Sequence, residues 1–161
     1  MYLNLKNEEN IYHFIIKIFI LIIFATNLNA QEQCNTKQII GSNTVITLPQ
    51  IGIVNIKSKV DTGARTSSLH CSEISMDTTK KWVTFVPLNE IKSIKMPISR
   101  ITTVKSSNAS AEKRAFIKLK TVINNCSYVT EFSLTNRTGM RYPALLGRNL
   151  LKNNFIVDVS F

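Results

Sequence analysis

The chain has 161 residues, 44% of them apolar, which suits one domain with a core of ordinary size and argues against several domains. Its formal net charge is +10, which excludes an acidic protein and suits a nucleic-acid surface, an acidic substrate or an anionic membrane, without deciding among them. The sequence has no zinc-finger spacing and no aromatic residues interleaved with Lys and Arg, so nucleic-acid binding is not expected.

The first thirty residues have the pattern of a secretory signal. Lys6 and Lys17 precede a short apolar run, and the small residue Ala30 ends the segment. Because Lys17 interrupts the apolar stretch, it falls short of the roughly 20 residues of a spanning helix, although an uncleaved anchor is the alternative. We expect a periplasmic or secreted protein with a signal peptide over 1–30, an N-terminal tail over 31–43 and one domain over 44–161.

Three cysteines lie in the predicted mature chain, namely Cys34, Cys71 and Cys126. In an exported protein this number allows one disulfide and one free thiol. Cys34 lies in the tail, where it either pairs with another subunit or has no role, and we favour no role.

After the tail, the pattern is that of short β-strands. Strands are expected at 45–48, within 51–60, at 69–74 and at 82–86, with a turn over 77–80. The alternation of apolar and polar residues is strongest over 115–134, where Asn124-Asn125 divides it into a hairpin. Trp82 is expected in the core, and the Ser/Thr/Asn-rich segment 99–113 is expected to be an exposed, mobile loop.

The C-terminal part starts with an apolar run over 143–147 that ends in a turn. One or two helical turns are expected over 148–153, and a last strand over 155–159. The fold class predicted from these elements is all-β, a small closed barrel-like domain with one short C-terminal helix.

The candidate catalytic motif is Asp61-Thr62-Gly63-Ala64, directly after a predicted strand. A carboxylate at the bottom of a cleft can hold a water nucleophile, and a glycine lets the backbone approach closely there. By itself, Asp-Thr-Gly at a strand end is more often an ordinary turn. A second element, Leu145-Leu146-Gly147-Arg148 before a short helix, changes this interpretation.

In both motifs and in their order the sequence resembles retropepsins. It is more similar still to a bacterial family of retropepsin-like domains often labelled ATP-dependent zinc proteases. The resemblance runs from about Val45 to Phe161 and includes the run from Ile56 to His70. It implies the retropepsin (acid protease) fold, with catalytic residues Asp61, Thr62 and Gly63 and substrate-binding residues Ala64, Arg65, Gly147 and Arg148.

The chain has only one Asp-Thr-Gly, whereas aspartic proteolysis needs two carboxylates that share a proton. The resemblance therefore implies a homodimer with Asp61 of each chain at a two-fold axis. One Asp61 would activate water, the other would polarise the scissile carbonyl, and a flap drawn from 99–113 would close over a peptide or protein substrate. The expected function is an exported aspartic endopeptidase. The alternatives are a proteolytically inactive peptide- or partner-binding module of the cell envelope and a basic surface-binding domain.

The sequence departs from the retroviral pattern at Arg65, where those enzymes carry an acid that pairs with the Arg of the Gly-Arg-Asn run. Arg148 must therefore find another partner, such as Asp158 or the chain terminus. Arg65 either puts positive charge near Asp61, which would oppose proton sharing, or points to solvent or to Glu73, and both alternatives stay open.

Two further arginines, Arg137 and Arg141, flank a predicted loop. They either bind an acidic partner or are simply solvent-exposed residues of a turn, and we favour the second alternative.

No cofactor and no metal site are expected, despite the family label. His70 and Cys71 are neighbours on a predicted strand, so they point to opposite faces and do not easily share a zinc ion. ATP binding would require a glycine-rich phosphate loop, which the sequence lacks. His70 is expected to be a packed or hydrogen-bonded strand residue.

Overall fold

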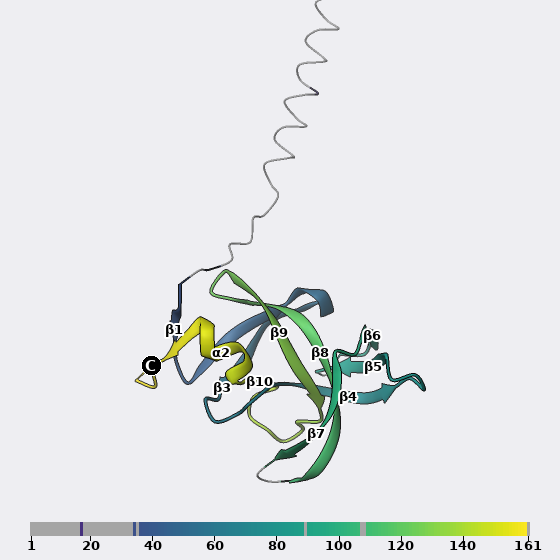
Figure 1. The fold of residues 1–161 in the computed structure, drawn as a ribbon. Coiled ribbons are helices and arrows are strands. Elements are labelled where there is room, and N and C mark those ends of the chain that lie inside the picture. Colours follow the sequence, from purple (N-terminus) through teal and green to yellow (C-terminus); the bar gives the residue numbers. More distant parts are fainter. Residues whose placement is uncertain (1–16, 18–33, 35, 89, 107–108, 161) are drawn as a thin grey trace, which may run out of the picture. The chain divides into compact units, whose positions relative to one another are not determined.

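The structure is a computed structural model that describes residues 17, 34, 36–88, 90–106 and 109–160 (Figure 1). Apart from Lys17, the predicted signal peptide lies outside the described residues, as do residues 107–108 of the predicted flap. No helix in the described part of the chain is long and apolar enough to cross a membrane.

Six strands close into a barrel in the order β10-β3-β2-β8-β9-β4, and β4 pairs back with β10. Their bounds are Asn43–Leu48 for β2, Ile53–Val60 for β3, Ser67–Met76 for β4, Ala109–Ile123 for β8, Cys126–Thr135 for β9 and Ala144–Leu146 for β10. The short strand β10 closes the barrel, because it lies parallel to β3 and antiparallel to β4. The predicted all-β closed barrel is therefore confirmed.

The remaining elements extend the barrel. Strands β5 (Trp82–Pro87) and β6 (Ile94–Pro97) continue the sheet beyond β4, and β7 (Arg100–Ser106) pairs with β8. Pro49–Ile51 form a 3₁₀ turn, η1, and Arg148–Asn154 form α2, the predicted short C-terminal helix.

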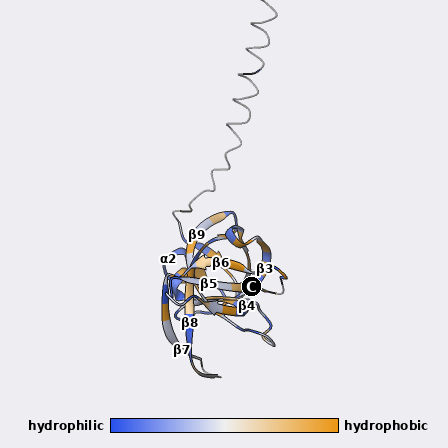
Figure 2. Ribbon diagram, turned by 90° about the vertical axis from the view of Figure 1, so that its right-hand side faces the viewer, coloured by the Kyte–Doolittle hydropathy of each residue, from blue (hydrophilic) through white to orange (hydrophobic). Residues whose placement is uncertain are grey.

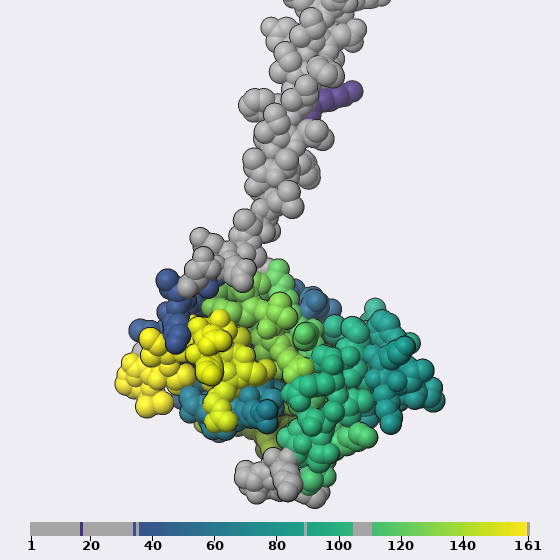
Figure 3. Space-filling model, viewed as in Figure 1, coloured from purple at the N-terminus to yellow at the C-terminus, as the bar shows by residue number. Residues whose placement is uncertain are grey.

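A separate two-stranded parallel sheet joins the ends of the domain. Its strands are β1 (Gln38–Ile40), which comes from the segment predicted as a tail, and β11 (Phe155–Val157). Figure 3 shows the yellow C-terminal residues packed beside the blue N-terminal strand.

Alternate residues of the strands fill the barrel, as the period of two requires. Figure 2 shows hydrophobic and hydrophilic residues distributed along the same strands. The most deeply buried apolar side chains are Phe85, Phe116, Phe132, Ile46, Leu48, Leu69, Ile117, Leu119, Ile123, Leu134, Leu146 and Leu150. The predicted hairpin is confirmed, since Ile123 pairs with Cys126 across a turn in which Asn124 and Asn125 both have positive φ. Asparagine tolerates this conformation better than most residues.

The expectation that Trp82 lies in the core is wrong, since 42% of its surface is exposed. Trp82 begins β5, and the neighbouring residues Val83 and Phe85 face inward instead. The ammonium group of Lys95 lies 5.5 Å from the centre of the exposed ring.

The expectation of a loop over 99–113 is also wrong for the residues that the structure describes in this segment. Residues 100–106 form β7, which pairs antiparallel with the first half of β8, Thr102 lying opposite Arg114. The Ser and Thr content suggested a loop, but Ile101, Thr102, Thr103 and Val104 are all β-branched and favour a strand. We call this paired unit, β7 with the facing part of β8, the cleft hairpin.

The cysteines form one disulfide, Cys34–Cys126, and leave Cys71 as a buried free thiol. One disulfide and one free thiol were expected, but the expectation that Cys34 pairs with another subunit or has no role is wrong. The parallel pairing of β1 with β11 brings the N-terminal segment to the barrel, and Gln38 Nε2 donates to Cys126 Sγ. Burial raises the pKa of Cys71 to about 12, so that thiol stays protonated.

Candidate active site

The Asp61 loop begins where β3 ends beside β10. The amide of Asp61 donates to the carbonyl oxygen of Leu146 at 3.0 Å, which carries the pairing one residue beyond the strand. Asp61 Oδ1 then accepts hydrogen bonds from the amides of Gly63 at 3.0 Å and Ala64 at 3.1 Å. These bonds fix the carboxylate in an Asx-type turn, in which a Cβ at position 63 would lie only 3.3 Å from that same oxygen.

The second motif supports this loop from behind. A Cβ on Gly147 would lie 2.6 Å from the carbonyl carbon of Thr66, so only glycine fits there. The amides that follow donate to the loop, Arg148 N to Ala64 O at 2.9 Å and Asn149 N to Arg65 O at 3.2 Å. The structure thus brings together the two motifs from which the site was predicted.

Arg148 finds its partners in the same loop. Its Nη1 lies 3.4 Å from Thr62 O and 3.3 Å from Gly63 O, and it donates to both carbonyls. Asp158, which was expected as a partner, instead accepts from the hydroxyl and the amide of Ser160, and these bonds lower the pKa of Asp158.

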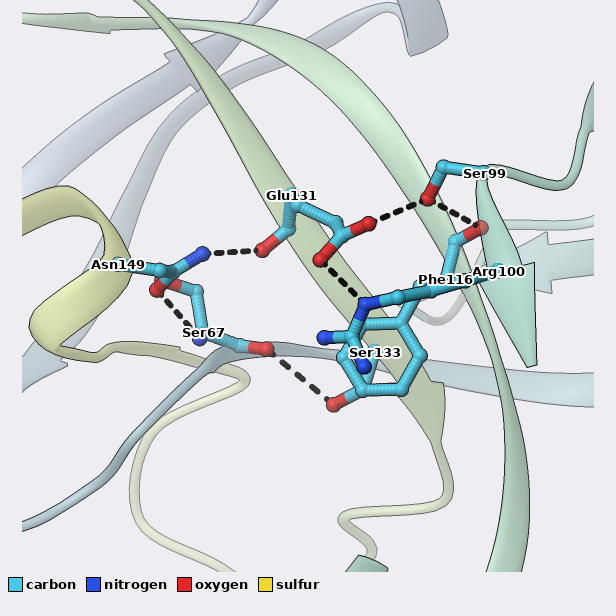
Figure 4. A network of polar contacts seen from close by, with 7 residues as sticks. All are labelled: Ser67, Ser99, Arg100, Phe116, Glu131, Ser133 and Asn149. Carbon is cyan, nitrogen blue, oxygen red and sulfur yellow. Dashed lines mark hydrogen bonds and ion pairs between the residues drawn. The ribbon is translucent and has the colours of Figure 1, made fainter. Parts of the chain in front are cut away.

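A polar network runs from Asn149, in the motif that supports the Asp61 loop, to the start of β7 in the cleft hairpin (Figure 4). Asn149 Oδ1 accepts from the amide and the hydroxyl of Ser67, and Asn149 Nδ2 donates to the carbonyl oxygen of Glu131. The carboxylate of Glu131 accepts from Ser99 Oγ at 2.6 Å and from Arg100 Nε at 2.8 Å. One residue of β9 therefore connects α2 with the start of β7.

A cleft of about 960 Å³ opens beside Asp61. The Asp61 loop forms one wall, Val104 and Arg114 of the cleft hairpin contribute to another, and residues of β3, β4, β9, β10 and the segment before β10 complete the lining. The charged residues among the described lining residues are one acid, Asp61, and five cations, Lys59, Arg65, Arg114, Arg137 and Arg141. The cleft is therefore strongly positive.

Arg137 is the most firmly held of these cations. Its Nη1 donates to Ser68 Oγ at 2.9 Å, its Nε donates to Tyr142 O at 3.2 Å, and its amide donates to His70 Nδ1 at 2.8 Å. Burial, and then the positive charge of Arg114, lower the pKa of Arg137, while Asp61 opposes this shift. The hydrogen bond to His70 confirms the expectation of a hydrogen-bonded strand residue.

Comparison with known families identifies the chain. Residues 39–161 match the family described as RimB-like, retropepsin-like aspartic endopeptidase RimB. The chain belongs to the RimB-like family. The resemblance to retropepsin-like domains is therefore confirmed.

Several known proteins are similar to this RimB-like chain. Proteins from Shewanella pealeana and Desulfotalea psychrophila, each named probable alpha-L-glutamate ligase, are 36% and 31% identical over 135 and 130 residues. The aligned regions are 78% and 76% of this chain, which spans only 29% and 28% of those relatives. A solved Legionella pneumophila protein of unknown function (DUF785) is 26% identical with a TM-score of 0.61, covering 78% of this chain and 96% of that one.

The structure places the predicted site residues of the RimB-like domain in two groups. Asp61, Gly63, Ala64 and Arg65 line the cleft, where Arg65 is also exposed to solvent, so both alternatives for Arg65 stay open. Thr62, Gly147 and Arg148 are not among the lining residues and belong to the loop and its support. The roles in catalysis and substrate binding stay predictions.

The sequence did not place three of these cations in the cleft. Arg137 and Arg141 line the cleft, while Arg137 Nε also donates to Tyr142 O across the turn, so the choice between partner binding and a role in the turn stays open. Lys59 was missed, although it precedes Asp61 by two residues on a strand and therefore shares its face. Its Nζ lies 3.9 Å from Asp61 Oδ2.

Metal ligands do not gather in the RimB-like domain as far as the structure describes it. Across residues 36–88, 90–106 and 109–160, no group of three His, Cys, Asp or Glu side chains is placed to hold a metal ion.

Proposed function

We propose that this chain is an exported aspartic endopeptidase that cleaves acidic peptides. The observation that carries the proposal is the carboxylate of Asp61, held by two backbone amides beside a cleft in which it is accompanied by five cations. Family membership supports the reaction type, since the family is described as an aspartic endopeptidase.

The chemistry requires a homodimer. Each chain supplies one Asp61, and peptide hydrolysis of this type uses two carboxylates that share one proton. Gly63 and Ala64 hold Oδ1, which leaves Oδ2 to interact with a water or a second Asp61. One carboxylate takes the proton of the attacking water, and its protonated partner polarises the scissile carbonyl.

The cleft cations set the substrate class. Guanidinium groups pair well with carboxylates, and Arg65, Arg114, Arg137 and Arg141 present four of them around Asp61. The relatives named glutamate ligases make glutamate-rich peptides the first acidic peptides to test.

Export is part of the proposal. The Cys34–Cys126 disulfide supports an oxidising compartment, in agreement with the predicted signal peptide. Cell fractionation combined with N-terminal sequencing tests this. A mature N-terminus near Gln31 in the envelope or medium is expected, and a full-length cytoplasmic protein would contradict it.

The activity is tested with the mature chain and two labelled peptides of equal length, an oligoglutamate and an oligolysine, between about pH 3 and pH 8. We expect cleavage of the oligoglutamate alone, and loss of this cleavage in Asp61→Asn. Cleavage that persists in Asp61→Asn would exclude Asp61 as the catalytic group.

The second candidate function is a binding module without proteolysis. The ion pair between Lys59 and Asp61 favours it, because an ammonium group 3.9 Å from Oδ2 competes with a second Asp61 for that oxygen. Tight binding of the oligoglutamate by the wild type, with no cleavage at any pH, would identify the module.

A further inference from the structure

We infer that an acidic peptide drives two copies of this chain together, because the cations around Asp61 otherwise hold the copies apart. The inference rests on the proposed function and adds a regulation of the same site. It follows from where the charges lie.

Two cations lie so close to Asp61 that any dimer that joins two Asp61 residues also brings these cations together. Lys59 Nζ lies 3.9 Å from Asp61 Oδ2, and the two side chains are 53% and 28% exposed. Arg65 follows in the same loop, is exposed and lines the same cleft. Two Asp61 carboxylates can therefore meet only if two Lys59 and two Arg65 side chains also come close.

The balance of these charges is positive. In each chain, five cations and one acid line the described cleft, so two chains that share a cleft bring together ten cations and two acids. Outside the lining, the carboxylate of Glu112 on the cleft hairpin lies 2.7 Å from Arg114 Nε. Even with one Glu112 counted in each chain, the joined cleft keeps an excess of positive charge that opposes association.

A peptide rich in carboxylates reverses this balance. It reaches cations of both copies only when the two halves are joined, so it binds the dimer more tightly than it binds one chain. By thermodynamic linkage, a ligand that prefers the dimer must shift the equilibrium toward the dimer.

The salt dependence provides a second test, because added salt should strengthen dimerisation without peptide and weaken the binding of an acidic peptide. Screening weakens the repulsion between the cleft cations, so added salt should favour the dimer when no peptide is present. The same screening weakens attraction of an acidic peptide to the cleft. An ordinary charge-stabilised dimer would instead dissociate with added salt.

Sedimentation velocity of the mature chain tests the inference, with an oligoglutamate and an oligolysine as probes and with cleavage followed in the same samples. We expect oligoglutamate to lower the dimer dissociation constant at least about tenfold, and oligolysine to leave it unchanged. The variant Lys59→Gln/Arg65→Gln should dimerise without peptide. The matched control Lys92→Gln/Lys118→Gln removes the same charge from exposed positions outside the cleft and should behave as the wild type.

Three results would overturn the inference: oligoglutamate binding with an unchanged dimer constant, a dimer that dissociates with added salt, or equal association of the cleft variant and its control. Failure of the proposed function is a different result. It is the absence of oligoglutamate binding and cleavage, and in that case the salt series and the paired variants still decide whether cleft charge limits association.

Discussion

Asn149 Oδ1 accepts hydrogen bonds from both the amide and the hydroxyl of Ser67, at 2.9 and 2.8 Å. Ser67 Oγ in turn accepts from the amide of Gly147 at 3.0 Å. The side chain of one helix residue thus fixes the start of β4 and, through it, the glycine packed behind the Asp61 loop.

Replacing Asn149 by Ala should lower the free energy of unfolding by about 1–3 kcal/mol, because the fully buried amide and hydroxyl of Ser67 lose their acceptor. Asn149→Asp keeps the acceptor and loses only the donor to Glu131 O, so it should cost less. Urea unfolding measures both. Asn153→Ala, an exposed position on the same helix, is the control, and equal stability of the two alanine variants would contradict the prediction.

Gly147→Ala should destabilise the protein by about 1–3 kcal/mol or more, because its Cβ would meet backbone atoms of Thr66 at 2.6 and 2.7 Å. Backbone atoms cannot move aside as a flexible side chain can, so the Asp61 loop should shift and cleavage should fall as well. Thermal unfolding and peptide cleavage check the two effects.

Gly139→Ala is the control for Gly147→Ala. Gly139 has open space around its Cβ position but a φ of +82°, so Ala should cost only about 1 kcal/mol there and leave cleavage unchanged. A larger effect at Gly139 than at Gly147 would show that steric contact at the second motif is unimportant.

The Cys34–Cys126 disulfide joins residues 92 positions apart and should contribute about 2–5 kcal/mol to stability, mainly by restricting the unfolded chain. The double variant Cys34→Ser/Cys126→Ser should therefore unfold at lower urea concentration. Wild-type protein treated with a reductant should match it. An unchanged midpoint in both samples would contradict the prediction.

The barrel and the Asp61 loop could be predicted because their signals are local. The period of two over 115–134 defines β8 and β9, and Asn124-Asn125 supplies the turn between them. The loop support was found through a second short motif around Gly147. Each motif consists of neighbouring residues, and the resemblance to retropepsins indicated that the two distant motifs meet.

The charge of the cleft could not be predicted in the same way, because its cations come from distant segments. Lys59 lies on β3, Arg114 on β8 and Arg137 after β9, and only barrel closure brings them to one cleft. The disulfide was missed for the same reason, since nothing local indicates that Cys34 reaches Cys126. The cleft hairpin was missed because Ser and Thr content was given more weight than β-branching.

Asp77 organises the turn between β4 and β5, accepting from Thr79 Oγ1 at 2.6 Å, from the amide of Lys81 at 2.8 Å and from the amide of Trp82 at 3.1 Å. The hydrogen bond from Thr79 is the main cause that lowers the pKa of Asp77, and the two amides act in the same direction. Because the folded-state pKa lies below that of the unfolded chain, the ionised carboxylate adds stability above the unfolded value of about 3.9. This stability is lost as the pH falls through the folded-state pKa.

Asp77→Ala should therefore lower the melting temperature at neutral pH, and the difference from the wild type should shrink as the pH falls below about 3.9. Thermal unfolding followed by circular dichroism over a pH series measures this difference. Glu90→Ala, which removes another exposed acid, controls for the change in net charge. A difference for Asp77→Ala that stays constant down to the lowest pH would mean that the turn depends on the shape of the side chain and not on its ionisation.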